Sequence, residues 1–172
     1  MLSCGAKGGY IPRPLGKKRV EAHVERRETH IMAVEEDEVH QAAQQFYAAQ
    51  PSGLNGDPKP MEELWSHASD VSVLPPSGGR VLGWEQVKAS WEHAAQAFSG
   101  GQVTLDEVVV VPITEDAAYT MGTERGHRKV GEKTIHFEGR VTNVYRREAG
   151  GWKIVHHHTD FSSEMIEALG GQ

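Results

Sequence analysis

Hydrophobic and polar positions along the chain follow two different periods. From Glu35 to Pro51, apolar side chains recur every three or four residues, which predicts an amphipathic helix. A short helix is expected at Pro60, because proline suits the first turn of a helix, and a third helix is expected over Trp84 to Phe98. After Gly100, the spacing changes to the alternation that is typical of strands. The expected strands are 71–74, 102–111, 117–128, 133–147 and 151–161.

The order of these elements predicts the fold class. Helices come first and long strands last, and the long strands are joined by short turns that cannot connect parallel neighbours. The chain is therefore expected to be α+β with an antiparallel sheet. We expect one domain over residues 35–165, a flexible basic leader over 1–34 and a short tail over 166–172. Met32 offers an alternative start, since the helix follows directly after it.

Composition and charge narrow the possible functions. The 172 residues suffice for one domain with its own core, and the net charge is -6. Residues 1–31 hold seven basic and three acidic side chains, so the leader carries +4 and the rest carries -10. An acidic body argues against nucleic-acid binding, and no apolar run is long enough to span a membrane. The single cysteine, Cys4, excludes an intramolecular disulfide and favours a reducing compartment such as the cytoplasm.

The last third of the chain carries a family resemblance. Residues 140–160 read RVTNVYRREAGGWKIVHHHTD, and the upstream segments GWEQVKASW and AYTMGTE fit the same scheme. From Glu35 to Glu164 the chain resembles the nuclear transport factor 2-like superfamily, which includes ketosteroid isomerase, the SnoaL-like polyketide cyclases and the association domain of calcium/calmodulin-dependent kinase II. The resemblance implies a cone: three N-terminal helices pack on a curved antiparallel sheet and enclose a pocket. It also implies a homodimer that forms through the other sheet face.

Alternation leaves the facing of the last strand open. Composition alone would turn Trp152 and Ile154 inward, whereas the resemblance places Val155, His157 and Thr159 in the pocket. We adopt the resemblance, because a sheet that is covered on one face and dimerised on the other buries both. The side chains then expected at or near a dimer interface are Trp152, Ile154, His156 and His158.

A residue-by-residue comparison with ketosteroid isomerase suggests modified chemistry. In that enzyme, a carboxylate base is opposed by a tyrosine and a protonated acid that stabilise the oxyanion. The resemblance places Tyr47 at the tyrosine, Asn143 at the acid and Pro75 at the base, and proline cannot accept a proton. The positions that buttress the tyrosine hold His67 and Trp91. His67 and His157 are therefore the candidate proton-transfer groups. The candidate catalytic residues are His67, His157, Tyr47 and Asn143.

The expected ligand is a small organic molecule. The kinase association domain collects arginines in its pocket, but the matching positions here, Met121, Asn143 and Thr159, are not basic. An apolar and aromatic lining suits a ligand with one or two polar groups and no cofactor. The expected ligand-binding residues are Trp91, Tyr119, Met121, Val141, Tyr145, Val155 and Thr159.

Several alternatives stay open at this point. His67 could pack against the short helix and His157 could be a core histidine, and the pocket could be a filled core. A metal site on His156 and His158 lacks a fixed third ligand, although His136 or Glu138 lies on the neighbouring strand, and no metal is expected. The function is then an isomerase, cyclase or dehydratase acting on a carbonyl compound, or a non-catalytic oligomerisation or ligand-sensing module. The sequence alone does not decide whether the protein is an enzyme.

Overall fold

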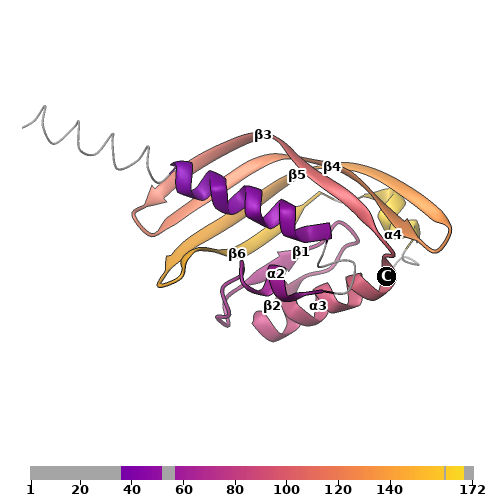
Figure 1. Ribbon diagram of the computed structural model, residues 1–172, viewed down its shortest axis with the longest axis horizontal. Coiled ribbons are helices and arrows are strands. Elements are labelled where there is room, and N and C mark those ends of the chain that lie inside the picture. Colours follow the sequence, from indigo (N-terminus) through magenta and orange to yellow (C-terminus); the bar gives the residue numbers. More distant parts are fainter. Residues whose placement is uncertain (1–35, 52–56, 161, 169–172) are drawn as a thin grey trace, which may run out of the picture. The chain divides into compact units, whose positions relative to one another are not determined.

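The computed structural model describes residues 36–51, 57–160 and 162–168 (Figure 1). The chain divides into two units, residues 1–33 and 34–172, and all described residues belong to the second unit. The basic leader and Cys4 lie outside the described residues. No helix of the described part is long and apolar enough to cross a membrane. The elements are a helix over residues 36–51, α2 (Lys59–Glu62), β1 (Ser72–Leu74), β2 (Val81–Leu82), α3 (Trp84–Ala97), β3 (Gly101–Thr114), β4 (Ala117–Val130), β5 (Lys133–Glu148), β6 (Gly151–Thr159) and α4 (Ser163–Ala168).

The strands form one six-stranded curved sheet in the order β2-β1-β6-β5-β4-β3. The four long strands pair antiparallel, as the short turns between them predict. The expected α+β class, with helices packed on a curved sheet, is thus confirmed. Two features were not expected: β1 pairs parallel with β6, and β2 and α4 had no clear signal in the sequence. The parallel pair is possible because β1 and β6 are separated by most of the domain.

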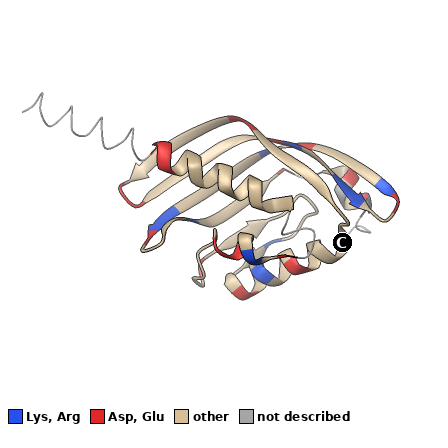
Figure 2. Ribbon diagram, viewed as in Figure 1, with Lys and Arg blue, Asp and Glu red and all other residues tan. Residues whose placement is uncertain are grey.

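The core lies between one face of the sheet and the helices. Residues 36–51 present Val39 and Phe46 to the sheet, where they pack in one cluster with Tyr145 and Ile154. Phe46 also contacts Trp91 of α3 edge to face, so both helices cover the same sheet face. All three charged side chains of the first helix stand in its first turn, where acidic groups complement the helix dipole (Figure 2).

A β-bulge in β6 decides which side chains face the core. Tyr145 pairs with Ile154 and Val144 with His156, so Val155 is the extra residue. Before the bulge, Trp152 and Ile154 point inward and are buried, which corrects the expectation that they lie at a dimer interface. After the bulge, His157 and Thr159 point inward.

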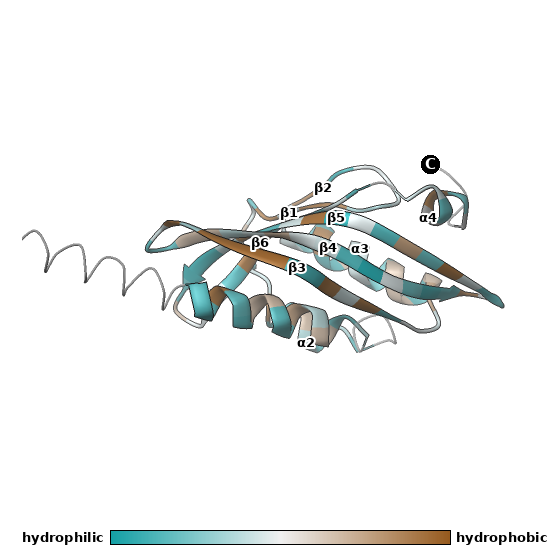
Figure 3. Cartoon of the chain, turned by 90° about the horizontal axis from the view of Figure 1, so that it is seen from above, coloured by the Kyte–Doolittle hydropathy of each residue, from teal (hydrophilic) through white to brown (hydrophobic). Residues whose placement is uncertain are grey.

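The other sheet face holds exposed apolar side chains near the middle of the long strands. Val109 on β3 and Met121 on β4 are paired neighbours and are 50% and 42% exposed. Figure 3 shows the hydrophobic stretch of β3 to which Val109 belongs. These two side chains are adjacent and form a small exposed apolar area on the outward face.

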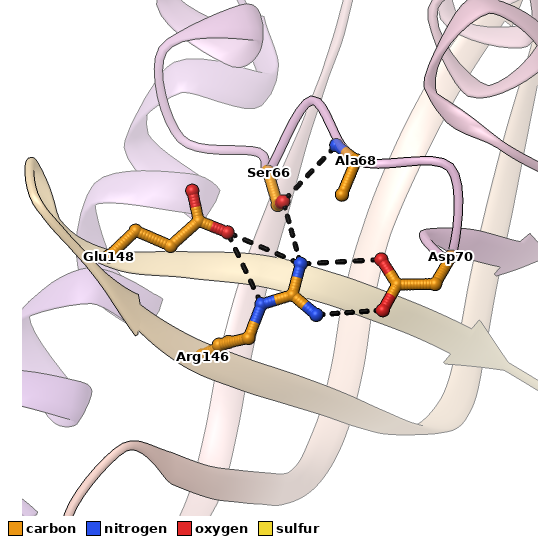
Figure 4. A network of polar contacts seen from close by, with 5 residues as sticks. All are labelled: Ser66, Ala68, Asp70, Arg146 and Glu148. Carbon is orange, nitrogen blue, oxygen red and sulfur yellow. Dashed lines mark hydrogen bonds and ion pairs between the residues drawn. The ribbon is translucent and has the colours of Figure 1, made fainter.

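Arg146 ties the loop before β1 to the sheet (Figure 4). Its guanidinium donates two hydrogen bonds to Asp70, at 2.7 and 3.3 Å, and one to Ser66 Oγ at 3.0 Å. Glu148 accepts two further bonds from the same group. Arg146 thereby lowers the pKa of the Asp70 carboxyl. The network fixes the segment that leads into β1, whose Val73 lies beside His157.

Candidate functional site

His157 stands on β6 with only 4% of its surface exposed. Its Nδ1 lies 2.6 Å from Asn143 Oδ1, and because a carbonyl oxygen can only accept, Nδ1 carries the hydrogen. The Asn143 amide nitrogen lies 3.4 Å from the Tyr47 hydroxyl, which fixes the orientation of the amide. The Nε2 atom of His157 is thus left with its lone pair. This is the tautomer in which Nε2 can accept a proton.

Glu124 on β4 joins these residues into one buried network. Its Oε1 accepts a hydrogen bond from the Tyr47 hydroxyl at 2.7 Å, and its Oε2 accepts one from Thr159 Oγ1 at 3.1 Å. His157 Nε2 lies 3.9 Å from Oε1 and 3.1 Å from the Thr159 hydroxyl. The Thr159 hydroxyl has only one proton to donate. When it donates that proton to Glu124, His157 Nε2 receives no hydrogen bond from Thr159.

Burial and charge set the protonation states of this network. Burial lowers the pKa of His157, because the protonated form loses hydration, and the Glu124 charge opposes this effect. Burial and the Glu124 charge together raise the pKa of Tyr47, so the phenol keeps its proton. His157 is consequently a neutral base at pH 7 beside a carboxylate that would stabilise its protonated form.

A cavity of about 210 Å³ opens against His157. One wall comes from α3 and the residues after it, and the floor comes from the inward faces of β4 and β6. The sheet contributes both charged side chains of the lining, Glu124 and Arg128, and most of the lining surface is apolar. The lining residues are Gln50, Val73, Pro75, Pro76, Ser77, Ser90, Trp91, His93, Ala94, Ala97, Phe98, Val103, Glu124, Arg128, Phe137, His157 and Thr159.

Three of the four candidate catalytic residues come together. Tyr47, Asn143 and His157 share the buried network, although only His157 itself lines the cavity. His67 lies elsewhere: it is exposed, its ring stacks on Trp84 at 4.1 Å, and its Nε2 donates to the Glu62 carbonyl at 2.9 Å. This contact satisfies a carbonyl at the end of α2, as the alternative of a packing role for His67 predicts.

The expected ligand-binding residues divide into three groups. Trp91 and Thr159 line the cavity. Tyr119 and Met121 stand on the opposite face of β4, because the inward positions of that strand are Ala118, Thr120 and the residues that continue their alternation. The remaining three do not line the cavity: Val141 and Tyr145 are buried beside it, and Val155 is the bulge residue.

Sequence reasoning missed Glu124 and Arg128, which are both buried on the inward face of β4. Their signal was present in the four-residue spacing, which places both charges on one face of a strand. Gly122 and Gly126 continue the same face. A Cβ at Gly126 would overlap the Gln102 carbonyl, so the glycine allows β3 and β4 to approach closely where the sheet bends. Among the described residues, no group of three His, Cys, Asp or Glu side chains could hold a metal ion.

The SnoaL-like domain model matches residues 39–163, which is most of the chain. The chain belongs to the SnoaL-like domain family. Among solved structures, this SnoaL-like domain is similar to a proposed dehydratase of the NTF2-like family from Streptomyces avermitilis. The two are 26% identical with a TM-score of 0.67, over 76% of this chain and 97% of that one.

Two further solved structures extend the comparison. A proposed calcium/calmodulin-dependent protein kinase type II association domain from Thiobacillus denitrificans is 26% identical with a TM-score of 0.56, over 71% of this chain and 93% of that one. An NTF2-like superfamily protein from Salmonella enterica is 20% identical with a TM-score of 0.67, over 76% and 93%, and shows the shared fold. Among curated proteins, none matches this SnoaL-like domain. The expectation of an NTF2-like fold is confirmed.

Proposed function

We propose that this SnoaL-like protein is an enzyme that moves a proton on a small carbonyl compound, with His157 Nε2 as the general base. The observation that carries the proposal is the 2.6 Å hydrogen bond that His157 Nδ1 donates to Asn143. Because Nδ1 carries the hydrogen, Nε2 keeps its lone pair, and His157 lines an apolar cavity. Tyr47 and Asn143 are positioning residues, because the Tyr47 proton is donated to Glu124 and the Asn143 amide contacts both His157 and Tyr47.

The proposed step begins at a carbon next to a carbonyl group. His157 Nε2 removes a proton from that carbon, and the Glu124 carboxylate stabilises the imidazolium that forms. Returning the proton to another carbon gives an isomerisation. Transferring it to a departing β-hydroxyl group expels water and gives a dehydration. The similarity to the proposed dehydratase from Streptomyces avermitilis supports dehydration as the first reaction to test.

An exchange assay tests the base without knowledge of the natural substrate. Purified protein is incubated in D₂O with 2-tetralone, phenylpyruvate and 3-hydroxy-3-phenylpropanoate, and loss of the proton next to the carbonyl is followed by NMR. We expect the wild type to accelerate exchange, and His157→Gln to lose a factor of about 100 or more. His158→Gln is the matched control, because His158 is the next residue on β6 and is exposed. Equal rates for wild type and His157→Gln would exclude His157 as the base.

A second candidate function is an association module. The exposed pair Val109 and Met121 and the similarity to the proposed kinase association domain favour self-association through the outward sheet face. We propose a homodimer on this surface, which is compatible with catalysis in each cavity. Native mass spectrometry should report a dimer that Met121→Glu dissociates. A purely non-catalytic module would keep its biological function in His157→Gln, whereas an enzyme would lose it.

We also propose a cytoplasmic location, since the whole sequence holds one cysteine. Fractionation of cells that express the tagged chain tests this location, and recovery in a secreted or membrane fraction would contradict it.

A further inference from the structure

Arg128 is a buried cation at the edge of the cavity, and no acidic group among the described residues forms an ion pair with it. It stands on the inward face of β4 with 4% of its surface exposed, and it lines the cavity. Its Nη2 donates to Gln50 Oε1 at 2.7 Å, but its Nη1 is buried without a hydrogen-bond partner among the described residues. None of the ion pairs between described residues includes Arg128.

This arrangement leaves a charge that is only partly compensated. Burial lowers the pKa of Arg128 to about 10, and the Glu124 charge opposes the shift, so the side chain stays protonated at pH 7. Glu124 itself already accepts hydrogen bonds from Tyr47 and Thr159. A buried guanidinium that lacks a paired carboxylate is unfavourable unless something else supplies the negative charge.

The surroundings of Arg128 indicate where that charge would come from. The Phe98 and Phe137 rings lie 6.0 and 5.9 Å from the guanidinium carbon, and both rings line the same cavity. Trp91 adds a third aromatic wall. Both Phe rings lie within cation–π distance of the guanidinium, but neither accepts a hydrogen bond from Nη1, and an acceptor group on an apolar ligand would supply one.

We infer that the ligand of this cavity is a small carboxylic acid with one ring, whose carboxylate binds Arg128 while its ring fills the apolar space toward His157. The inference rests on the proposed function, since it names the substrate class of the same site. The volume sets the size: an apolar cavity of about 150 Å³ binds benzene, so about 210 Å³ admits one ring with a short side chain. Arginine suits a carboxylate because its donors match the two oxygens of that group.

This ligand class differs from the one that the sequence predicts. The comparison with the kinase association domain found no basic side chain at Met121, Asn143 or Thr159. Arg128 reaches the cavity from a different position, one that only the inward facing of β4 reveals. The lining is therefore largely apolar and carries two charged side chains, Arg128 and Glu124, of which Glu124 already accepts hydrogen bonds from Tyr47 and Thr159.

Matched pairs of acids and amides test the inference by binding alone. Benzoate, phenylacetate and 3-phenylpropanoate are titrated by calorimetry against benzamide, phenylacetamide and 3-phenylpropanamide, which have nearly the same shape without the charge. We expect at least one acid to bind about tenfold or more tightly than its amide. In Arg128→Gln this preference should disappear while the amide affinities stay within about threefold, which also shows that the cavity is intact.

Two controls locate the effect. Arg125→Gln removes a cation from the same strand, but Arg125 pairs with Asp106 and Glu138 on the other face and should leave the preference unchanged. In the wild type, the NMR signal of the Arg128 Nε–H should shift on addition of the preferred acid. Equal affinities for acids and amides, no acid binding at millimolar concentration, or equal effects of the two arginine variants would overturn the inference.

The binding and exchange assays separate the two proposals. His157→Gln should retain the preference for acids, because it leaves Arg128 in place. Acids that bind through Arg128 without exchange in the wild type would refute the proposed enzyme and keep the ligand class. Exchange on the neutral 2-tetralone without any preference for acids would refute the ligand class and keep the enzyme.

Discussion

The buried bond between Tyr47 and Glu124 offers a direct measurement of the network. Tyr47→Phe removes only the hydroxyl and leaves the ring in its contact with Phe46. The lost bond is 2.7 Å long and joins two buried groups, and bonds to charged acceptors contribute about 1.5–3 kcal/mol. The 3.4 Å contact to Asn143 adds little at that length. We therefore expect the free energy of unfolding to fall by about 2–3 kcal/mol.

Urea unfolding followed by tryptophan fluorescence measures this change, and the slope with denaturant should stay constant. A double-mutant cycle with Glu124→Gln isolates the charge. In that background the bond has a neutral acceptor, and Tyr47→Phe should cost only about 1 kcal/mol. Tyr119→Phe is the control, because Tyr119 stands on the other face of β4, and its change should stay below about 0.5 kcal/mol.

The outcome that refutes the reasoning is specific. If Tyr47→Phe costs less than about 0.5 kcal/mol in both backgrounds, Glu124 does not accept a functional hydrogen bond from Tyr47. The network would then not hold His157 and Asn143 in the orientation on which the proposed base depends.

Three further outcomes follow from the described contacts. Burial lowers the pKa of His157 below its unfolded value of about 6.5, so its contribution to stability is complete above that pH. The contribution declines as the pH falls toward the folded pKa, by at most about 1.4 kcal/mol per pH unit, and urea unfolding of His157→Gln should lack this decline. Arg146→Ala should cost about 1 kcal/mol in thermal unfolding, less at high salt, and more than Arg140→Ala, whose ion pair with Asp160 is highly exposed. Deleting Val155 removes only the extra residue and leaves Trp152, Ile154, His157 and Thr159 facing inward in regular alternation, so circular dichroism should show a folded protein, and Val155→Ala should cost less than about 2 kcal/mol.

The sequence predicts the elements of this fold well, because each long element repeats one period many times. The helix over 36–51 and α3 follow the three- and four-residue spacing, and the long strands end at the expected turns within a few residues. β2 and α4 are two and six residues long, which is too short for a period to emerge. The parallel pairing of β1 with β6 depends on contacts between distant segments, and no local pattern encodes it.

The facing of β6 could not be predicted because alternation assumes an unbroken strand. Composition pointed Trp152 and Ile154 inward, and the resemblance pointed His157 and Thr159 inward. Both hold, each on its own side of the bulge at Val155. Glycine marks many irregular strand positions, but the bulge here falls on a valine, which gives no such indication in the sequence. Without a visible bulge, the two facings of β6 exclude each other.

The facing of β4 was missed for a different reason. Placing Tyr119 and Met121 inward leaves Glu124 and Arg128 to solvent, which is the ordinary arrangement of charged residues. The structure reverses it because each charge finds partners from distant segments: Tyr47 and Thr159 for Glu124, and Gln50 for Arg128. Such partnerships are visible only when the helix and the sheet are packed together.

The network also changes how the site could stabilise an oxyanion. By resemblance, Tyr47 and Asn143 would donate hydrogen bonds to the developing charge, but the Tyr47 proton is directed at Glu124 and the Asn143 amide at Tyr47. Tyr47 has one proton and could serve a substrate only by leaving Glu124 without this hydrogen bond, which is costly, whereas the Asn143 amide is held by its bonds to His157 and Tyr47. Arg128 has a free N–H among the described residues and needs no such exchange. Pro75, at the position of the isomerase base, lines the same cavity without a proton acceptor. The proposed base and the proposed anion-binding group therefore both stand on the sheet, on β6 and β4, and a substrate of the proposed reaction must span the distance between those two strands.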